Sequence, residues 1–281
     1  MAIDLHSHTT ASDGVMSPEE LVALSAGRGV TVLGVTDHDT LDGVTRAQAA
    51  GDGLGVRVVA GVELSCRHEG RSVHVLGLFC GAGLAAELAG KRGEREERAR
   101  RMVARLNELG YELTFEDVLE QSGTGVVGRP HVARALVARG HLPHTGAAFT
   151  SKLIADGGLA DVPRDLMSPR EAVAVVRRSG GVGVLAHPGP TRHGPGPTEA
   201  LIRDLAQAGL GGLEVDHPDH QPPEREKLRT LASELGLVVT GGSDCHGPDW
   251  SLPGTCVTSQ AEFERLEALA GISSQTTQAQ S

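Results

Sequence analysis

Residues 3–14 read IDLHSHTTASDG, a short apolar run followed by two histidines that flank one serine. Residues two apart in a β-strand point to the same face, so His6 and His8 at a strand end would aim two imidazoles at one point. Asp13 follows in a loop. Two ring nitrogens and a nearby carboxylate suit Zn²⁺, Mn²⁺ or Fe²⁺. Exposed histidine pairs are common, however, so a metal site is indicated only if further ligands follow later in the chain.

Composition narrows the class of protein. The 281 residues can hold one large domain, or a barrel with an inserted module. A formal net charge of −10 disfavours a general electrostatic grip on nucleic acid, so we expect no stable binding to a duplex. The sequence shows no leader-like segment and no apolar run of membrane-spanning length, and its four cysteines form no CxxC motif. These features predict a cytoplasmic protein with reduced thiols and no membrane partner.

Short β-branched runs alternate with helical stretches along most of the chain. The expected strands cover residues 3–5, 32–36, 56–62, 72–78, 182–186, 212–215 and 237–240. This alternation predicts an α/β fold with a mainly parallel sheet, and about seven strands favour a barrel over an open sheet. No helical stretch separates the third run from the fourth, so we expect these two to form a hairpin.

The alternation stops between residues 83 and 163, where the pattern is helical. The expected helices cover residues 84–108, 115–121, 129–139 and 145–154. We therefore predict a discontinuous catalytic barrel formed by residues 1–82 and 164–272. A helical insertion domain over residues 83–163 would interrupt it and cap the substrate. The polar stretch 273–281 is expected to be a disordered tail.

Potential metal ligands recur at the predicted strand ends, which is where barrels of alternating strands and helices carry their catalytic groups. We select nine residues on this basis: His6, His8, Asp13, His38, Glu63, His74, His187, Asp244 and His246. The sixth strand is followed by further candidates, Glu214, His217 and His220. The remaining histidines (His68, His141, His144 and His193) lack this placement and are expected to be structural. Asp39 is expected in a turn, and Cys245 is expected to pack away from its acidic and histidine neighbours.

These residues resemble the polymerase and histidinol phosphatase (PHP) superfamily. The resemblance runs through DLHSHTTASDG, TDHDT, GVELS, HVLG, AHPG and GGSDCHG, in order and across nearly the whole chain. It implies a distorted seven-stranded (β/α) barrel with a metal cluster in its mouth. GRPHVARALVARG at residues 128–140 resembles the helical insert of stand-alone phosphoesterases in this superfamily. Among these, the chain is most similar to 3′,5′-nucleoside bisphosphate phosphatases, some of which also trim short RNA from its 5′ end.

The resemblance implies three divalent metal ions, with Mn²⁺ expected first and Fe²⁺ or Zn²⁺ as alternatives. The implied ligand sets are His6, His8, Glu63 and Asp244 for the first ion, Glu63, His74 and His187 for the second, and Asp13, His38 and His246 for the third. Asp37 is expected to orient a ligand from behind rather than to bind metal. His217 is a candidate acid for the leaving group, and equally a structural loop histidine.

A metal cluster suits phosphate ester hydrolysis, and the chain has no GxSxG or P-loop motif. We expect it to remove the 3′-phosphate of nucleoside 3′,5′-bisphosphates, giving 5′-mononucleotides, with trimming of short oligoribonucleotides as a further activity. The second phosphate needs cations, for which the candidates are Arg129, His131, Arg98, Arg101 and Lys152. The alternative for the arginines of this run is a solvated helix face. Asp216 stands where relatives are expected to carry a tyrosine, which affects the pocket wall.

Three other functions stay open. A histidinol-phosphate phosphatase would need an insert shaped for an aminoimidazole, which the GRPH-type insert disfavours. A 3′–5′ DNA exonuclease is disfavoured by the acidic charge and by the lack of a polymerase region. A non-catalytic metal-binding scaffold is disfavoured because all nine candidate ligands are present.

Overall fold

A seven-stranded sheet forms the centre of the computed structural model, which describes residues 1–190 and 196–272. Its strands are β1 (Ala2–Asp4), β2 (Val30–Val35), β3 (Arg57–His68), β4 (Arg71–Leu78), β5 (Val182–Leu185), β6 (Gly212–Asp216) and β7 (Val238–Gly241). The strands lie side by side in chain order. Strand β4 is antiparallel to both neighbours, and the other pairings are parallel. The α/β class and the hairpin between the third and fourth strands are confirmed.

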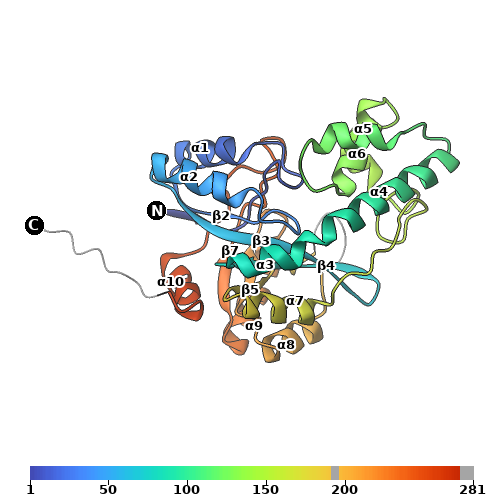
Figure 1. Cartoon of the computed structure of the whole chain (residues 1–281). Coiled ribbons are helices and arrows are strands. Elements are labelled where there is room, and N and C mark those ends of the chain that lie inside the picture. The colour runs from blue at the N-terminus through green and yellow to red at the C-terminus, as the bar shows by residue number, and fades with distance from the viewer. Residues whose placement is uncertain (191–195, 273–281) are drawn as a thin grey trace, which may run out of the picture.

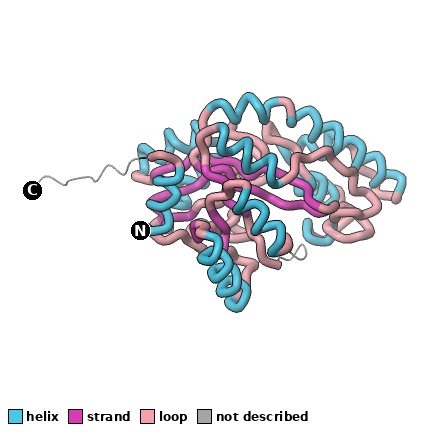
Figure 2. The backbone as a smooth tube through the Cα atoms, turned by 90° about the horizontal axis from the view of Figure 1, so that it is seen from below, coloured by secondary structure: helices cyan, strands magenta, loops and turns pink. Residues whose placement is uncertain are grey.

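Helices surround this sheet (Figures 1 and 2). The barrel helices are α1 (Pro18–Gly27), α2 (Val44–Leu54), α7 (Pro169–Arg178), α8 (Glu199–Gln207), α9 (Pro222–Leu235) and α10 (Gln260–Leu269). α1 and α7 begin with capping boxes, in which Ser17 and Ser168 exchange hydrogen bonds with a glutamate three residues on. All four cysteines are buried and free, and Cys245 packs in an apolar cluster as expected. Within the described residues, no helix is both long and apolar enough to cross a bilayer.

The barrel closes only at one end. No ladder pairs β1 with β7, but the segments that follow these strands are joined through the backbone. The Leu5 N–H donates to the Gly241 carbonyl at 3.3 Å, and the His8 N–H donates to the Cys245 carbonyl at 2.9 Å. Below these bonds the buried Asp4 carboxylate accepts from the N–H groups of Ser243, at 2.9 Å, and of Gly254, at 2.7 Å. The closed end is therefore the one that carries His6 and His8.

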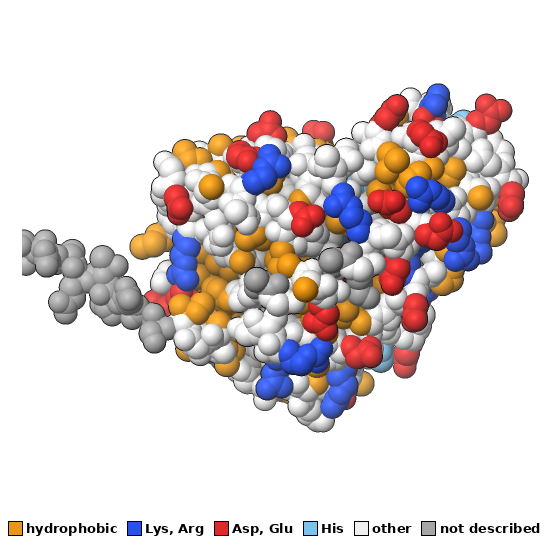
Figure 3. Space-filling model, viewed as in Figure 1, with side chains coloured by type: hydrophobic (Ala, Val, Ile, Leu, Met, Phe, Trp, Pro, Cys, Tyr) orange, Lys and Arg blue, Asp and Glu red, His pale blue; other side chains and the backbone are white. Residues whose placement is uncertain are grey.

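The region between β4 and β5 forms a separate helical lobe, drawn mainly in green in Figure 1. It contains α4 (Lys91–Glu108), α5 (Phe115–Ser122), α6 (Arg129–Ala138) and a 3₁₀ helix, η1 (Thr145–Ala148). The preceding helix α3 (Ala82–Ala89) instead packs on the barrel, where Leu84 and Leu88 join the core cluster of the sheet. The lobe has its own apolar cluster, which includes Leu106, Leu136 and Ile154. Acidic and basic side chains are interspersed over the face seen in Figure 3, on the lobe and on the barrel. The lobe lies where the helical insertion was expected, and residues 83–163 remain our proposal for its bounds.

Two expected helices of the lobe differ from the structure. The single helix over residues 84–108 is interrupted at Gly90, since glycine is unfavourable in a helix interior. The helix over residues 145–154 is reduced to η1 and turns, in which the Thr150 and Ile154 N–H groups both donate to the Ala148 carbonyl. The expected tail at residues 273–281 lies outside the described residues.

We predict that Asp4→Ala lowers the free energy of unfolding by about 3 kcal/mol, because the backbone N–H groups of His6, Ser243 and Gly254 lose their acceptor. Asp4→Asn keeps one acceptor oxygen and should lose less. Urea unfolding monitored by circular dichroism would measure both changes, with Asp52→Ala on the exposed face of α2 as the matched control. An Asp4→Ala variant as stable as that control would show that Asp4 does not hold the seam between β1 and β7.

Candidate metal centre

Glu63, in the middle of β3, is the hub of a buried histidine–carboxylate cluster. Five imidazole nitrogens lie within 3.3 Å of its carboxylate oxygens, from His6, His8, His38, His74 and His187. Asp244 Oδ1 lies 3.3 Å from His6 Nε2 and 3.2 Å from His8 Nε2. His246 Nε2 lies 3.4 Å from Asp13 Oδ1. The structure thus brings all nine sequence-predicted residues together at one end of the barrel.

The cluster contains three groups whose ligand atoms lie within 4.8 Å of one another. These groups are His6, His8, Glu63 and Asp244; His8, Asp13, His38 and His246; and His38, Glu63 and His74. The first group has the same members as the first implied ligand set. The other two groups differ from the implied sets, because His8 also belongs to the group of Asp13 and His246, and His38 also belongs to the group of Glu63 and His74. His187 reaches the third group through Glu63, with its Nε2 at 3.0 Å from Glu63 Oε1.

The backbone places several of these side chains in uncommon ways. His74 lies in the first half of β4, yet it reaches the cluster because β4 runs antiparallel to β3 and pairs it with Ser65. His187 and Asp244 have positive φ angles of 29° and 49°. Non-glycine residues rarely adopt such angles, and the strain concentrates at functional sites. Both strained residues directly follow barrel strands, where the chain must turn to aim their side chains inward.

Groups behind the cluster fix its imidazoles. His6 Nδ1 lies 2.9 Å from Glu214 Oε1, so a proton held on Nδ1 leaves the Nε2 lone pair facing Asp244. The other oxygen of Glu214 accepts the His187 N–H at 2.7 Å. His246 Nδ1 likewise faces the Asp244 carbonyl at 2.9 Å, which leaves Nε2 for the cluster. Metal-binding histidines in proteins are commonly oriented by such outer partners.

The two predicted catalytic residues occupy different positions. Asp37 lies behind the loop that carries Asp13, and it accepts from the Thr9 N–H at 2.8 Å and the Ser12 hydroxyl at 2.6 Å. His217 borders the cluster directly, with Nε2 at 3.4 Å from Asp244 Oδ2. Its Nδ1 accepts the N–H of Asp219 at 3.1 Å, so the ring proton lies on Nε2. Asp37 is placed to hold a loop, and His217 to hold a proton near the cluster.

The residues fit a divalent cation. Buried ligand atoms without a hydrogen-bond partner among the described residues are Nδ1 of His8, His38 and His74 and Oδ1 of Asp244. Burial would raise the pKa values of Glu63 and Asp13, but the surrounding histidines hold them well below their usual range. Burial lowers the pKa of His38 to about 3, so this imidazole is a neutral nitrogen donor. Although burial opposes them, neighbouring carboxylates hold the pKa of His6 well above its usual range and raise the pKa of His8 to about 10. A cation at these two rings would therefore displace their protons. Ionised carboxylates and neutral imidazoles are the donor set that Mn²⁺, Fe²⁺ and Zn²⁺ accept.

Of the predicted phosphate-binding residues, His131 reaches the loop beside this cluster, where it forms a hydrogen bond with the Ser12 backbone and interacts electrostatically with Asp13. Arg98 pairs with Asp161 at 2.9 Å, and Arg129 pairs with Asp156 at 2.7 Å, both within the lobe. Arg101 and Lys152 are exposed. His131 is buried, and its Nδ1 accepts the Gly128 N–H at 2.9 Å.

Arg134 on α6 is a residue that the sequence reasoning missed. Its Nη1 donates to the Asp13 carbonyl oxygen at 3.0 Å, which brings a guanidinium from the lobe to the edge of the cluster. A sequence signal existed, because Arg134 lies three residues after His131, and side chains at this spacing share one helix face.

Asp39 anchors the lobe to the barrel. It lies in a turn, as expected, with a φ of 51°, but it is also buried and ion-paired. Arg95 of α4 donates to its Oδ2 through Nε at 3.0 Å, Arg164 does so at 3.3 Å, and the Ser65 N–H donates to Oδ1 at 2.8 Å. These arginines hold the Asp39 pKa well below its usual range although burial opposes them. The lobe is therefore tied to the residue directly after His38.

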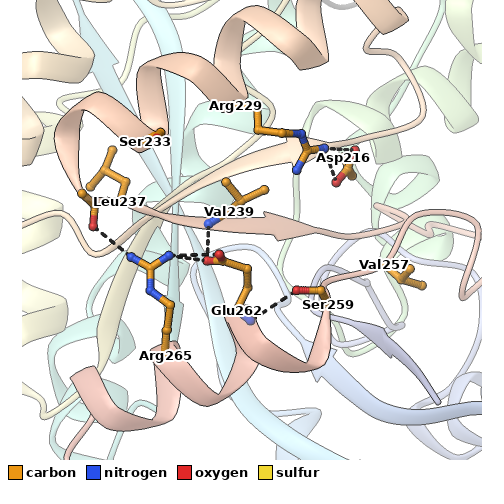
Figure 4. Close-up of a pocket in the computed structure, with 10 residues that line it drawn as sticks. Asp216, Arg229, Ser233, Leu237, Val239, Val257, Ser259, Glu262 and Arg265 are labelled. Carbon is orange, nitrogen blue, oxygen red and sulfur yellow. Dashed lines mark hydrogen bonds and ion pairs between the residues drawn. The ribbon is translucent and has the colours of Figure 1, made fainter.

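A cavity of about 490 Å³ lies between α9 and α10, away from the cluster (Figure 4). Its charged groups are paired with one another, Asp216 with Arg229 at 3.0 Å and Glu262 with Arg265 at 2.8 Å. Asp216 therefore faces α9 rather than a wall of the cluster. This cavity belongs to the packing of the outer helices.

Known proteins resemble this chain over most of its length. Residues 4–140 match the model of the PHP domain. The chain is 39% identical over 262 residues to the phosphoribosyl 1,2-cyclic phosphate 1,2-diphosphodiesterase of Eggerthella lenta, covering 90% of this chain and 97% of that protein. It is 34% identical over 248 residues to the 5′-3′ exoribonuclease of Haemophilus influenzae, covering 87% of this chain and 90% of that protein.

The chain is also similar to a phosphatase and to a protein of known structure. The chain is 34% identical over 250 residues to the 3′,5′-nucleoside bisphosphate phosphatase of Chromobacterium violaceum, covering 88% of this chain and 87% of that protein. A solved structure of a proposed metal-dependent phosphoesterase from Bifidobacterium adolescentis superposes with a TM-score of 0.87. It is 33% identical and covers 95% of each chain. The distorted barrel expected from the sequence is thereby confirmed.

We predict that Mn²⁺ raises the thermal midpoint of chelator-treated protein, because an ion that binds only the folded state adds about 2.7 kcal/mol at a concentration 100-fold above its Kd. Calorimetry and metal analysis would measure this. Glu63→Gln should weaken the shift and lower the bound metal, since Glu63 touches five imidazoles. His141→Ala serves as the control, because this histidine lies in the lobe and its Nε2 faces the Glu112 carbonyl at 2.8 Å. Equal midpoints with and without Mn²⁺ would contradict a metal centre here.

Proposed function

The chain belongs to the PHP family of metal-dependent phosphoesterases, and on that premise we propose that it removes the 3′-phosphate of nucleoside 3′,5′-bisphosphates. The observation that carries the proposal is the cluster around Glu63, with three overlapping ligand groups open to solvent along one side. Its solvent-reached members are His38, His74, His187 and His246, whose side chains are 15% to 22% exposed. A phosphate group can therefore approach the cluster from the side that these four histidines line.

We propose three divalent ions, with Mn²⁺ first, held by the nine residues of the cluster. Glu63 would bridge the ion held by His6, His8 and Asp244 to the ion held by His74 and His187. Asp13, His38 and His246 would hold the third ion, with His8 close enough to contribute. When bound, such ions neutralise phosphoryl oxygens and lower the pKa of water, so that it can attack phosphorus at neutral pH.

The chain's own residues supply the remaining steps. His217 carries its proton on Nε2 next to the cluster, so it is placed to donate that proton to the departing sugar oxygen. Asp37 fixes the loop of Asp13 through Thr9 and Ser12, which keeps a ligand in place rather than reacting itself. Glu214 performs the same positioning for His6.

The second phosphate needs a cation beyond the metals. We assign this role first to Arg134, because a guanidinium has five donors and the Asp13 carbonyl takes one. His131 lies on the same helix, and Arg98, Arg101, Arg129 and Lys152 add positive charge to the lobe. Their engagement with Asp161 and Asp156 makes Arg98 and Arg129 weaker candidates for direct contact.

The relatives favour a ribose substrate that carries a phosphate beside the reacting one. A phosphoribosyl cyclic phosphate, a nucleoside 3′,5′-bisphosphate and RNA all contain a phosphorylated ribose. Hydrolysis of a 1,2-cyclic phosphate is the second candidate activity, because the relative with that name is 39% identical over nearly its whole length. Trimming of short RNA from the 5′ end is a further candidate on the same chemistry.

We predict phosphate release from adenosine 3′,5′-bisphosphate in the presence of Mn²⁺, with adenosine 5′-monophosphate as the other product. His38→Ala should lose most of the rate and part of the metal while staying folded, because it leaves two ligand groups incomplete. Phosphate assays, metal analysis and circular dichroism would follow the three effects, with His141→Ala as the control. Parallel assays with phosphoribosyl 1,2-cyclic phosphate, histidinol phosphate and 5′-phosphorylated short RNA would rank the candidates. Absence of turnover on the bisphosphate would exclude the assignment.

We predict that Arg134→Met raises KM for adenosine 3′,5′-bisphosphate roughly tenfold or more, since a hydrogen bond to a charged group contributes about 1.5–3 kcal/mol. Adenosine 3′-monophosphate lacks the second phosphate, so its KM should not change. Arg203→Met on α8, an exposed residue paired with Glu199 and Glu234, is the matched control. An equal effect on both nucleotides would mean that Arg134 acts through the Asp13 loop instead.

A further inference from the structure

Trp250 is an aromatic side chain at the rim of the cluster. Its ring centroid lies 5.5 Å from that of His246, and the residue is 38% exposed. His246 in turn stacks on His8 at 4.0 Å, so only one imidazole separates the indole from the centre of the cluster. A group held over Trp250 would lie beside a phosphate held at the cluster.

The exposure of this indole is unusual for this chain. The sequence has one tryptophan, one tyrosine and four phenylalanines. The other five aromatic residues all pack in apolar clusters, Tyr111, Phe115 and Phe149 in the lobe and Phe79 and Phe263 in the barrel. No apolar cluster of the described residues includes Trp250. Its position is therefore not explained by core packing.

The local backbone holds Trp250 in place. The Trp250 N–H donates to the Gly247 carbonyl at 3.0 Å, and Gly247 pairs with Ser251 across a tight turn. The Val15 N–H donates to the His246 carbonyl at 2.8 Å, and Val15 packs so closely on Gly247 that a Cβ there would lie 2.5 Å from its methyl group. Val15 is itself 54% exposed. Two exposed apolar side chains thus border the rim next to His246.

We infer that Trp250 is a stacking platform for the base of a nucleotide substrate, which makes it the residue that separates nucleotides from base-free sugar phosphates. This inference rests on the proposed function, because it places the base beside a 3′-phosphate held at the cluster. Aromatic side chains stack on any base, so the platform binds nucleotides as a class and does not choose among bases. Arg134 borders the same loop through Asp13, so the base and the 5′-phosphate of one nucleotide can be held on the same rim.

Catalytic specificity provides the first test. Trp250→Leu should lower kcat/KM for adenosine 3′,5′-bisphosphate about tenfold, mainly through KM, which corresponds to the stacking of one base. The rate on ribose 3,5-bisphosphate, which lacks a base, should not change. Trp250→Phe keeps an aromatic face and should restore most of the loss. Equal losses on both substrates would mean that Trp250 only supports His246, and no loss on either would also overturn the inference.

Binding without turnover provides the second test and keeps the inference separate from the proposed function. Trp250 is the single tryptophan, so intrinsic fluorescence excited at the indole reports on this site alone. Adenosine 5′-monophosphate should quench it in the Mn²⁺-loaded protein, whereas ribose 5-phosphate should not. If the bisphosphate is not hydrolysed but the nucleotide still quenches selectively, the proposed reaction fails and the platform stands. Equal quenching by both compounds, or none by either, would overturn the platform.

Discussion

The buried carboxylate of Glu63 is the constraint on which the rest of the structure depends. A buried charge is unfavourable unless it is paired, and here five imidazoles approach it from four segments of the chain. Although burial opposes them, the carboxylates of the cluster raise the pKa values of His6 and His8, so without an ion these two rings hold protons that balance the buried charge. A cation would displace those protons and take over the same role. The closed end of the barrel serves the same cluster, because the Asp244 N–H donates to the His6 carbonyl at 2.9 Å and so brings Asp244 beside His6 and His8.

The helical lobe is coupled to the same centre by contacts next to His38 and at Asp13. Asp39 binds Arg95 and Arg164 directly after His38, and Arg134 binds the carbonyl of Asp13. Breaking a buried ion pair leaves an uncompensated charge, so the first contact holds the lobe firmly. The second contact brings a cation to the cluster edge. A lobe placed this way can recognise a substrate without contributing any member of the cluster.

The sequence revealed most of the cluster because its ligands lie in or just after predicted strands. It predicts the strands near His6, Glu63 and His187 through short runs of β-branched apolar residues. It could not reveal why His74 belongs, since that depends on the antiparallel direction of β4. Asp39 was expected in a turn and is in one, but its burial under Arg95 arises from contacts 56 residues apart in the chain. Trp250 was missed for the same reason, because nothing local distinguishes a loop tryptophan near a site from one far away. For Arg134 the spacing from His131 placed both on one helix face, but only the fold shows that this face meets the Asp13 loop.

The residues of the cluster and the residues that could recognise the rest of a substrate lie in different parts of the structure. Relatives with different named activities share the barrel and much of the sequence, so the residues at the strand ends cannot by themselves decide the substrate. Imidazoles and carboxylates hold metal ions rather than sugars, so under the proposed function the cluster would bind the reacting phosphate whatever sugar carries it. Selectivity must then come from side chains that contact the substrate beyond the reacting phosphate. Two side chains at the cluster's edge could make such contacts in the described part of this chain, the guanidinium of Arg134 and the indole of Trp250. One matches a second phosphate and the other a planar base, which together describe a nucleotide more closely than a free sugar phosphate.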